Sequence, residues 1–333
     1  MARSHLTLAA LATAAVPGLD VVTTSSFGTG TVGDYDAALL TDRAGHHWIA
    51  RLPRSQRAEA EQNADIVALQ ALSAGVRTRL PFVVSTYAGR TPINGTHAVV
   101  YEFVYGTKIP LAKLDADTAT SIGRAIAAIH ALPTSFVADA GLPVLTPQEC
   151  LRAAITIIDR AAGTGRVPGA LLERWEGATE EAGLWQFQPT VINGGLSADS
   201  FLMANGDVTG VLGWQELRVG DPAKDLFWLL GSRGELVAES GFDAYNHERG
   251  GDRQVRQRAM LYAELEIAKW LLHGTDTRSS DIVDDAVDMM HGLIDSFEDD
   301  ATPINAQTPP TMAVDEVQAM LNMSDNDRNE SSR

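Results

Sequence analysis

The sequence predicts an α+β protein with two lobes, a small antiparallel sheet followed by a mainly helical part. At 333 residues the chain is longer than most single cores, so a bilobal unit or two domains is expected. Roughly the first hundred residues contain short runs in which apolar and polar positions alternate, as they do in half-buried strands. After Tyr105 the apolar residues recur instead at helical spacing.

The N-terminal lobe is expected to span residues 1–104 and to carry one long helix. That helix, over 55–74, places Ile66, Leu69 and Leu72 at helical spacing, and Gly75 is expected to end it. A shorter helix is expected to follow Ser4, although its alanine-rich run also mimics a signal peptide, and that alternative stays open. The expected strands are "VVTTSSF", "YDAALLTD", "HHWIARLP", "PFVVSTYA" and "HAVVYEFV".

The C-terminal lobe, residues 105–297, is predicted to be helical with one inserted β-hairpin. Asn205 and Gly206 in "SFLMANGDVTGVLGW" suit a tight turn with positive φ angles. Thr146 and Glu149 form the capping box of one expected helix. The expected helices span 117–131, 147–162, 169–182, 222–231, 253–272 and 282–297.

Residues 298–333 have the composition of a disordered acidic tail, with proline and few large apolar residues. The run "AVDEVQAMLNM" within the tail could form a weak docking helix or remain solvated chain. Both interpretations stay open for this run.

Charge and cysteine content exclude several classes of partner. A net charge of −17 opposes binding to nucleic acid or to an anionic membrane, because the long-range field repels phosphates. Cys150 is the single cysteine, which excludes an internal disulfide and fits a reducing compartment. No segment approaches the roughly 18 apolar residues of a membrane span. We therefore expect a cytoplasmic protein that binds a small molecule or a protein.

The segment "GTGTVG" has the glycine spacing of a phosphate-binding loop, and its three glycines are Gly28, Gly30 and Gly33. A dinucleotide-binding fold needs a helix after these glycines, whereas a strand is predicted here. The strand-loop-strand context instead suits the flap that covers nucleotide phosphates in kinases. A purely structural turn is equally open, because Asp34 and Asp36 would place negative charge near a phosphate.

Arg51 emerges from the mostly apolar strand "WIARLPR", where a cation needs a carboxylate partner. The next helix offers two candidates one turn apart, Glu61 and Asp65. Protein kinases pair a strand lysine with a helix glutamate in the same way. The alternative is that Arg51, Arg54 and Arg57 are solvated surface charges.

The order of the motifs is more specific than any single motif. A glycine-rich hairpin precedes "WIARLPR", "VVYEFVYG", "SIGRAIAAIHALP" and "VGDPAKDL". In this order the chain resembles the macrolide and aminoglycoside phosphotransferase family, which has a protein-kinase-like fold, up to about Phe297. The resemblance implies that ATP or GTP binds in a cleft between the lobes. The residues expected to contact the nucleotide are Gly28, Gly30, Gly33, Arg51, Glu61, Asp65, Glu102 and Phe103.

The same resemblance indicates that the catalytic motifs have degenerated. Family members carry a His-Gly-Asp-Leu run, an asparagine five residues after its aspartate, and an Asp-Trp or Asp-Phe pair beyond a hairpin. The resemblance implies that the first aspartate is the catalytic base and that the asparagine and the later aspartate bind metal. This chain reads Asn193, Gly194, Gly195 and Leu196, then Ser200, then Gly213 before Trp214. No dedicated magnesium site is therefore expected.

These losses predict a large decrease in rate. Loss of a general base costs on the order of 10² to 10⁴ in rate, and loss of metal stabilisation costs several kcal/mol more. Starting from about 1 to 100 turnovers per second for kinases, we expect activity near or below about 10⁻³ per second. Two alternatives remain: Asp199 or Glu216 replaces the lost ligands in an active phosphotransferase, or the chain is an interaction module that binds no nucleotide.

Overall fold

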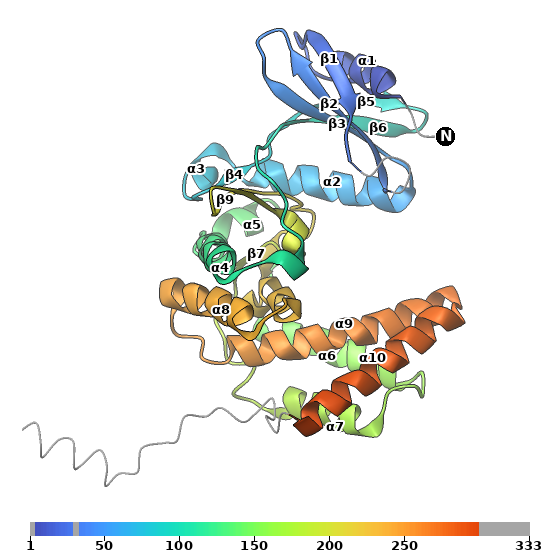
Figure 1. Ribbon diagram of the computed structural model, residues 1–333, viewed down its shortest axis with the longest axis vertical. Helices are drawn as coiled ribbons and strands as arrows, with labels where there is room; N and C mark the ends of the chain where they lie inside the picture. Colours follow the sequence, from blue (N-terminus) through green and yellow to red (C-terminus); the bar gives the residue numbers. More distant parts are fainter. Residues whose placement is uncertain (1–3, 29–32, 300–333) are drawn as a thin grey trace, which may run out of the picture.

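A computed structural model describes residues 4–28 and 33–299 of the chain. It has the expected α+β architecture, with a sheet lobe above a helical lobe (Figure 1). The expected tail falls almost entirely on residues 300–333, outside the described part. Within the described part, no helix has the length and apolar character needed to cross a membrane.

The N-terminal lobe is built on a five-stranded antiparallel sheet with the strand order β1-β2-β3-β6-β5. Arg51 in β3 lies opposite Ala37 of β2 and Val99 of β6. Because side chains alternate along a strand, Ala50 faces one side of the sheet and Arg51 the other. The strands are β1 (Val21–Ser26), β2 (Tyr35–Asp42), β3 (His47–Pro53), β5 (Tyr87–Ile93) and β6 (Thr96–Glu102).

Two helices cover the two faces of this sheet. Helix α1 (His5–Ala15) buries Leu8 and Ala12 against the face that contains Ala50, which confirms the expected helix after Ser4. The Ser4 hydroxyl caps the helix by accepting the N–H of Thr7 at 3.2 Å. Helix α2 (Gln56–Ala71) lies below the opposite face (Figure 1).

Two predictions at the end of α2 were wrong. Gly75 does not end the helix, which ends at Ala71 with Leu72 as its C-cap, and Gly75 lies inside the short helix α3 (Ala74–Arg77). The strand expected over "PFVVSTYA" is divided, since β4 (Val83–Val84) pairs with β9 of the helical lobe. The Arg77 guanidinium fixes this turn by donating to the carbonyls of Leu72 and Val84, at 2.6 and 2.8 Å.

The helical lobe packs its long helices in pairs, with α4 against α8 and α6 and α10 against α9. Helix α8 was not predicted. Its backbone approaches α4 closely at Gly123, where a Cβ would lie 2.2 Å from the carbonyl oxygen of Gly241 in α8. The helices are α4 (Ala116–His130), α5 (Ser135–Asp139), α6 (Pro147–Ala162), α7 (Gly169–Glu180), α8 (Glu235–Arg249), α9 (Val255–Thr277) and α10 (Ser280–Asp299).

The predicted hairpin is present as β8 (Phe201–Ala204) and β9 (Asp207–Val211). Asn205 and Gly206 adopt the expected positive φ angles of 54° and 87°. A second antiparallel pair is formed by β7 (Thr190–Ile192) and β10 (Arg218–Gly220).

The segment expected to be helical over 222–231 is helical, but it is not one continuous α-helix. This segment forms two 3₁₀ turns, η3 (Pro222–Asp225) and η4 (Phe227–Gly231). An α-helical turn would place Asp221 and Asp225 on one face. Their buried carboxylates instead bind different partners, Arg258 and the loop after β7.

Candidate functional site

A buried carboxylate holds the loop that follows β7. Asp225 accepts the backbone N–H groups of Asn193 and Gly194, both at 2.7 Å. Its Oδ2 also lies 3.1 Å from Nε2 of His130, and Nδ1 of His130 lies 3.0 Å from the Tyr245 hydroxyl. The loop conformation is therefore fixed from inside the helical lobe, by groups with very little exposure to solvent.

Asn193 connects this loop to the loop after β9. Its side-chain amide donates to the carbonyl of Gly213 at 2.8 Å, and its Oδ1 accepts the N–H of Gly195 at 3.2 Å. Asn193 itself is fully buried. It therefore joins the two segments that, by family resemblance, would carry the base and a metal ligand.

The two adjacent glycines of the loop differ in what the fold requires. Gly194 has a φ of +84°, and a Cβ there would lie 2.7 Å from the backbone oxygen of Glu216. Only glycine fits this position without rearrangement. At Gly195 the nearest atom to a Cβ would be Cγ of Glu216 at 3.7 Å, an ordinary contact. Packing therefore does not exclude a Cβ at position 195.

The positions that bind metal according to the family resemblance lack suitable donors in this chain. Magnesium prefers oxygen ligands from carboxylates, and Gly213, with a φ of +74°, offers no side chain. The Ser200 hydroxyl already accepts the N–H of Ser197 at 3.2 Å. Across residues 4–28 and 33–299, no three His, Cys, Asp or Glu side chains form a group that could hold a metal ion. The residues present do not fit the family's magnesium ion.

The two candidate replacement carboxylates lie in different surroundings. Asp199 has 80% of its side chain exposed, and its nearest cation is Lys108 at 4.0 Å. Glu216 lies beside Gly195, as its Cγ contact shows, and its Oε2 is 2.9 Å from Arg218. Of the two, only Glu216 is among the nearest contacts of Gly195.

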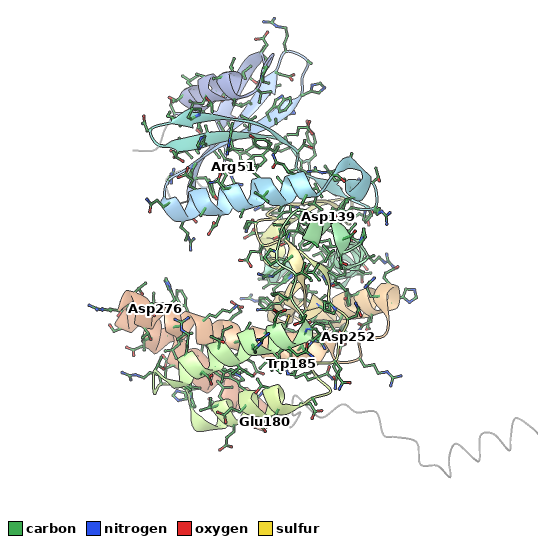
Figure 2. The ribbon with its side chains drawn as sticks, turned by 180° about the vertical axis from the view of Figure 1, so that it is seen from behind. Arg51, Asp139, Glu180, Trp185, Asp252 and Asp276 are labelled. Atoms are coloured by element: carbon green, nitrogen blue, oxygen red, sulfur yellow. The ribbon has the colours of Figure 1, made fainter. Side chains whose placement is uncertain are left out.

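Arg51 and Asp65 lie near each other between the sheet and α2 but do not form a direct ion pair. Figure 2 shows Arg51 on the underside of the sheet, where its guanidinium stacks 3.9 Å from the centre of the Tyr35 ring. Within the described residues no acid lies within 4.0 Å of it. Asp65 instead accepts the N–H of Trp214 at 2.8 Å, which connects α2 to the loop of Gly213.

The surroundings of Asp65 oppose its ionisation. Burial raises the pKa of its carboxyl, and the Trp214 hydrogen bond and nearby Arg51 offset only part of this effect. The other candidate on the helix, Glu61, lies 3.5 Å from Arg57 instead. Of the two acids, Asp65 is therefore the one that α2 directs to the site.

Arginines neutralise the acids beside the glycine-rich turn. Arg54 binds Asp36 at 2.6 Å and donates to the carbonyl of Gly33 at 2.8 Å, and exposed Arg57 lies 3.3 Å from Asp34. The expected repulsion of a phosphate by these acids is thereby reduced. Gly28 has a φ of +87°, and a Cβ added there would meet no atom within 4 Å. Gly30 lies outside the described residues.

The segment that connects the lobes begins at Glu102 and Phe103. Glu102 is exposed, and the backbone N–H of Phe103 donates to the carbonyl of His47 at 3.1 Å. The Phe103 ring meets Phe27 and Tyr105 edge to face, with centroids 6.1 and 4.9 Å apart. Aromatic side chains thus gather between the connecting segment and the start of the glycine-rich turn, where a planar base could stack.

The sequence reasoning did not assign the buried charges of the helical lobe. Asp221 does cap η3, through the N–H of Ala223 at 2.9 Å, but it also binds Arg258 at 2.8 Å and the Tyr262 hydroxyl at 2.9 Å. The available signal was the motif "VGDPAKDL", in which Asp221 and Asp225 follow a strand one helical turn apart.

Comparison with known proteins supports the same architecture. Residues 33–262 match the sequence model of the phosphotransferase enzyme family. The uncharacterized protein YcbJ of Bacillus subtilis (strain 168) is 25% identical over 210 residues, which cover 58% of this chain. The match spans 65% of that relative's length, less than two thirds.

Solved structures with the same fold include two macrolide phosphotransferases. The apoenzyme of macrolide 2'-phosphotransferase MphH from Brachybacterium faecium has a TM-score of 0.70 at 22% identity, over 84% of this chain and 96% of its own. Macrolide 2'-phosphotransferase type I has a TM-score of 0.67 at 24% identity, over 86% and 96%. The GDP and kanamycin complex of APH(2")-IIia has a TM-score of 0.69 at 19% identity, over 87% and 99%. Since the family model spans more than half of the sequence, this chain belongs to the phosphotransferase enzyme family.

Proposed function

We propose that this protein is a catalytically degenerate relative of the macrolide and aminoglycoside phosphotransferases. In this proposal it binds a nucleotide, a small molecule or a protein between its two lobes without useful phosphoryl transfer. The observation that carries the proposal is the contrast at the loop after β7. Asp225 and Asn193 hold its backbone by buried hydrogen bonds, while Gly195 and Gly213 offer no side chain for the reaction.

Three features support nucleotide as one ligand. Arg51 supplies a cation on the face of the sheet toward α2, and the acids beside the glycine-rich turn are paired with arginines. Aromatic rings gather at the connecting segment. Related structures were solved with GDP or ADP bound, which makes guanine and adenine nucleotides the ligands to test first.

A nucleotide-dependent melting series tests the proposal. ATP, ADP, GTP and GDP are added with and without magnesium, and a ligand at 100 times its Kd adds about 2.7 kcal/mol of stability. We expect at least one nucleotide to stabilise the protein to a similar extent with and without magnesium. Arg51→Met should reduce this stabilisation, whereas Arg90→Met on the exposed edge strand should not. Absence of stabilisation at every magnesium concentration would favour an interaction module that binds no nucleotide.

One alternative function is favoured by the position of Glu216. Its Cγ lies 3.7 Å from the Cβ position of residue 195, so its carboxylate could accept the proton of an acceptor alcohol. The protein would then be an active ATP- or GTP-dependent O-phosphotransferase for a small molecule. Asp199, exposed and near Lys108, lacks this proximity.

Paired variants separate the alternative from the main proposal. If Glu216 is the base, Glu216→Gln should lower turnover by about 10² to 10⁴, while Asp199→Asn leaves it unchanged. Assays cover macrolides, aminoglycosides and small alcohols with magnesium and manganese. If the unmodified protein shows no turnover in any of these assays, the alternative is rejected.

A further inference from the structure

Helix α2 lies below the N-terminal sheet (Figure 1), and a pocket of about 420 Å³ lies between this helix and the edge strand β5. This volume is within the range of ordinary small-molecule sites. On the helix side the lining residues are three or four positions apart, so they share one face of α2. They include Glu59, Asn63, Ile66 and Gln70. We call this space the α2–β5 pocket.

The sheet side of the α2–β5 pocket is formed by Tyr87 and Arg90 of β5 and by His97 of β6. Residues directly opposite each other on antiparallel strands share a face of the sheet. Arg90 lies opposite Val99 of β6, and Val99 is buried in the same core cluster as Ile66 of α2. Arg90 is therefore on the face of the sheet that α2 covers.

The α2–β5 pocket is separate from the expected nucleotide site. Val99 lies between Arg51 of β3 and Arg90 of β5, directly opposite both. Neighbouring strands are about 4.8 Å apart, so the backbones of the two arginines are about 10 Å apart with the buried valine between them. On α2, Asp65 lies on another face than the pocket-lining residues and binds the Trp214 N–H instead. A ligand in the pocket would therefore bind apart from a nucleotide.

The α2–β5 pocket contains groups of opposite charge at different positions. Arg90 is exposed, and no carboxylate of the described residues lies within 4.0 Å of it. Among the described cationic side chains only His97 lies within 4.0 Å of Glu59, at 3.8 Å. His97 is opposite Pro92, two residues beyond Arg90 in β5. The acidic and basic groups are therefore anchored about 7 Å apart along the sheet.

The remaining lining residues add apolar surface and neutral hydrogen-bonding groups. The Tyr87 ring meets that of Tyr101 edge to face, with centroids 6.5 Å apart, and Ile66 is buried. The exposed amides of Asn63 and Gln70 can donate and accept hydrogen bonds. This combination suits a ligand that carries an apolar group in addition to its charges.

We propose that the α2–β5 pocket binds a zwitterionic small molecule, an amino acid with an apolar side chain. The ligand carboxylate accepts from the Arg90 guanidinium, and the ligand ammonium donates to Glu59, both as charge-assisted hydrogen bonds. The apolar side chain of the ligand lies against Tyr87 and Ile66. A simple anion or cation would engage only one of the two charged groups. The inference goes beyond the proposed function, because it assigns a second ligand to a place that the nucleotide does not occupy.

Calorimetric titration of the full chain with three probes tests this inference. L-phenylalanine carries both charges, 3-phenylpropionate carries only the carboxylate, and phenethylamine carries only the ammonium. We expect L-phenylalanine to bind at least about tenfold more tightly than either analogue, because each analogue loses one hydrogen bond between charged groups. Equal binding by the three probes, or no binding by L-phenylalanine, would overturn the inference.

Variants of the two charged groups show whether the α2–β5 pocket is the place of binding. Arg90→Met removes the cation and keeps an apolar stem, and Arg79→Met, also exposed in the N-terminal lobe, is the matched control. We expect Arg90→Met and Glu59→Gln each to weaken L-phenylalanine binding at least about tenfold. Arg79→Met should bind as the unmodified protein does. Equal binding by Arg90→Met and Arg79→Met would contradict the inference.

Arg51→Met separates the α2–β5 pocket from the site between the lobes. L-phenylalanine should bind this variant as it binds the unmodified protein, and a loss of binding would place the ligand between the lobes and overturn the inference. Thermal melting without ligand confirms that each variant is folded. Nucleotide-dependent melting of the same samples reports separately on the proposed function.

Discussion

The two sides of the loop after β7 differ sharply. On its inner side Asn193, Asp225 and His130 are buried and joined by hydrogen bonds between 2.7 and 3.1 Å. On its reactive side Gly195 and Gly213 have no side chains, and the Ser200 hydroxyl is used within its own turn. The groups that stabilise the loop are therefore distinct from those that would perform chemistry, so catalytic groups can be lost while the loop is retained.

Removing the buried carboxylate should have the largest effect. Asp225→Ala leaves the N–H groups of Asn193 and Gly194 without acceptors inside the lobe, and each unsatisfied group costs about 1–3 kcal/mol. We expect the free energy of unfolding to fall by about 3 kcal/mol or more, measured by chemical denaturation. Asp199→Asn, on the exposed side of the same segment, should change it by no more than about 0.5 kcal/mol. Similar values for both variants would contradict the distinction between the two sides.

The adjacent glycines provide a sharper version of the comparison. Gly194→Ala forces a side chain into a positive φ, which costs about 1–2 kcal/mol, and into a 2.7 Å overlap with the Glu216 backbone. We therefore expect a loss of about 2 kcal/mol or more. Gly195→Ala has space for a methyl group, so it should leave the free energy of unfolding nearly unchanged. Thermal melting measures the stability of both variants. A larger loss for Gly195→Ala than for Gly194→Ala would contradict the requirement for glycine at position 194.

A smaller effect is expected where α2 meets the loop of Gly213. Asp65→Ala removes the acceptor for the Trp214 N–H and should cost about 1–3 kcal/mol. Asp65→Asn retains an acceptor oxygen and removes the buried charge, so at pH 7 it should be at least as stable as the unmodified protein. Chemical denaturation measures the free energy of unfolding of both variants. Equal losses of stability would show that the charge of Asp65 is itself required.

The pH dependence of the same pair has a defined sign. Because the pKa of Asp65 is raised above its usual 3.8, the folded protein binds this proton more tightly than the unfolded chain. The penalty of the buried charge is present at neutral pH and disappears as the pH falls through the raised pKa towards 3.8. The advantage of Asp65→Asn should therefore shrink on acidification, and an advantage that grew would contradict the raised pKa.

The features that the sequence predicted correctly depend on local signals. The Thr146 and Glu149 capping box and the Asn205-Gly206 turn act within a few residues, and alternation revealed the strands of the sheet. Helix α8 was missed because its Gly241 is unfavourable for a helix and lies against Leu229 and Ala119, contacts that the sequence does not reveal. The segment over 222–231 was read as an α-helix because the distant partners of Asp221 and Asp225 are invisible in the sequence.

The contacts within the candidate site could not be predicted from the order of its motifs. The family resemblance assigns reactive positions to Gly195 and Gly213, and the structure shows that Asn193 joins their two loops. Asp65 binds the Trp214 backbone instead of pairing directly with Arg51. This contact joins residues that are 149 positions apart, so it could not be predicted from local sequence.

The most direct test of the central claim is the rate of γ-phosphate release and transfer by the unmodified protein. It is measured with saturating ATP or GTP, with magnesium or manganese, and with a panel of alcohol acceptors. Without side chains at positions 195 and 213, the rate should remain near or below about 10⁻³ per second. A rate of about 1 per second or more, within the range of ordinary kinases, would contradict the claim that these two glycines have removed the chemistry.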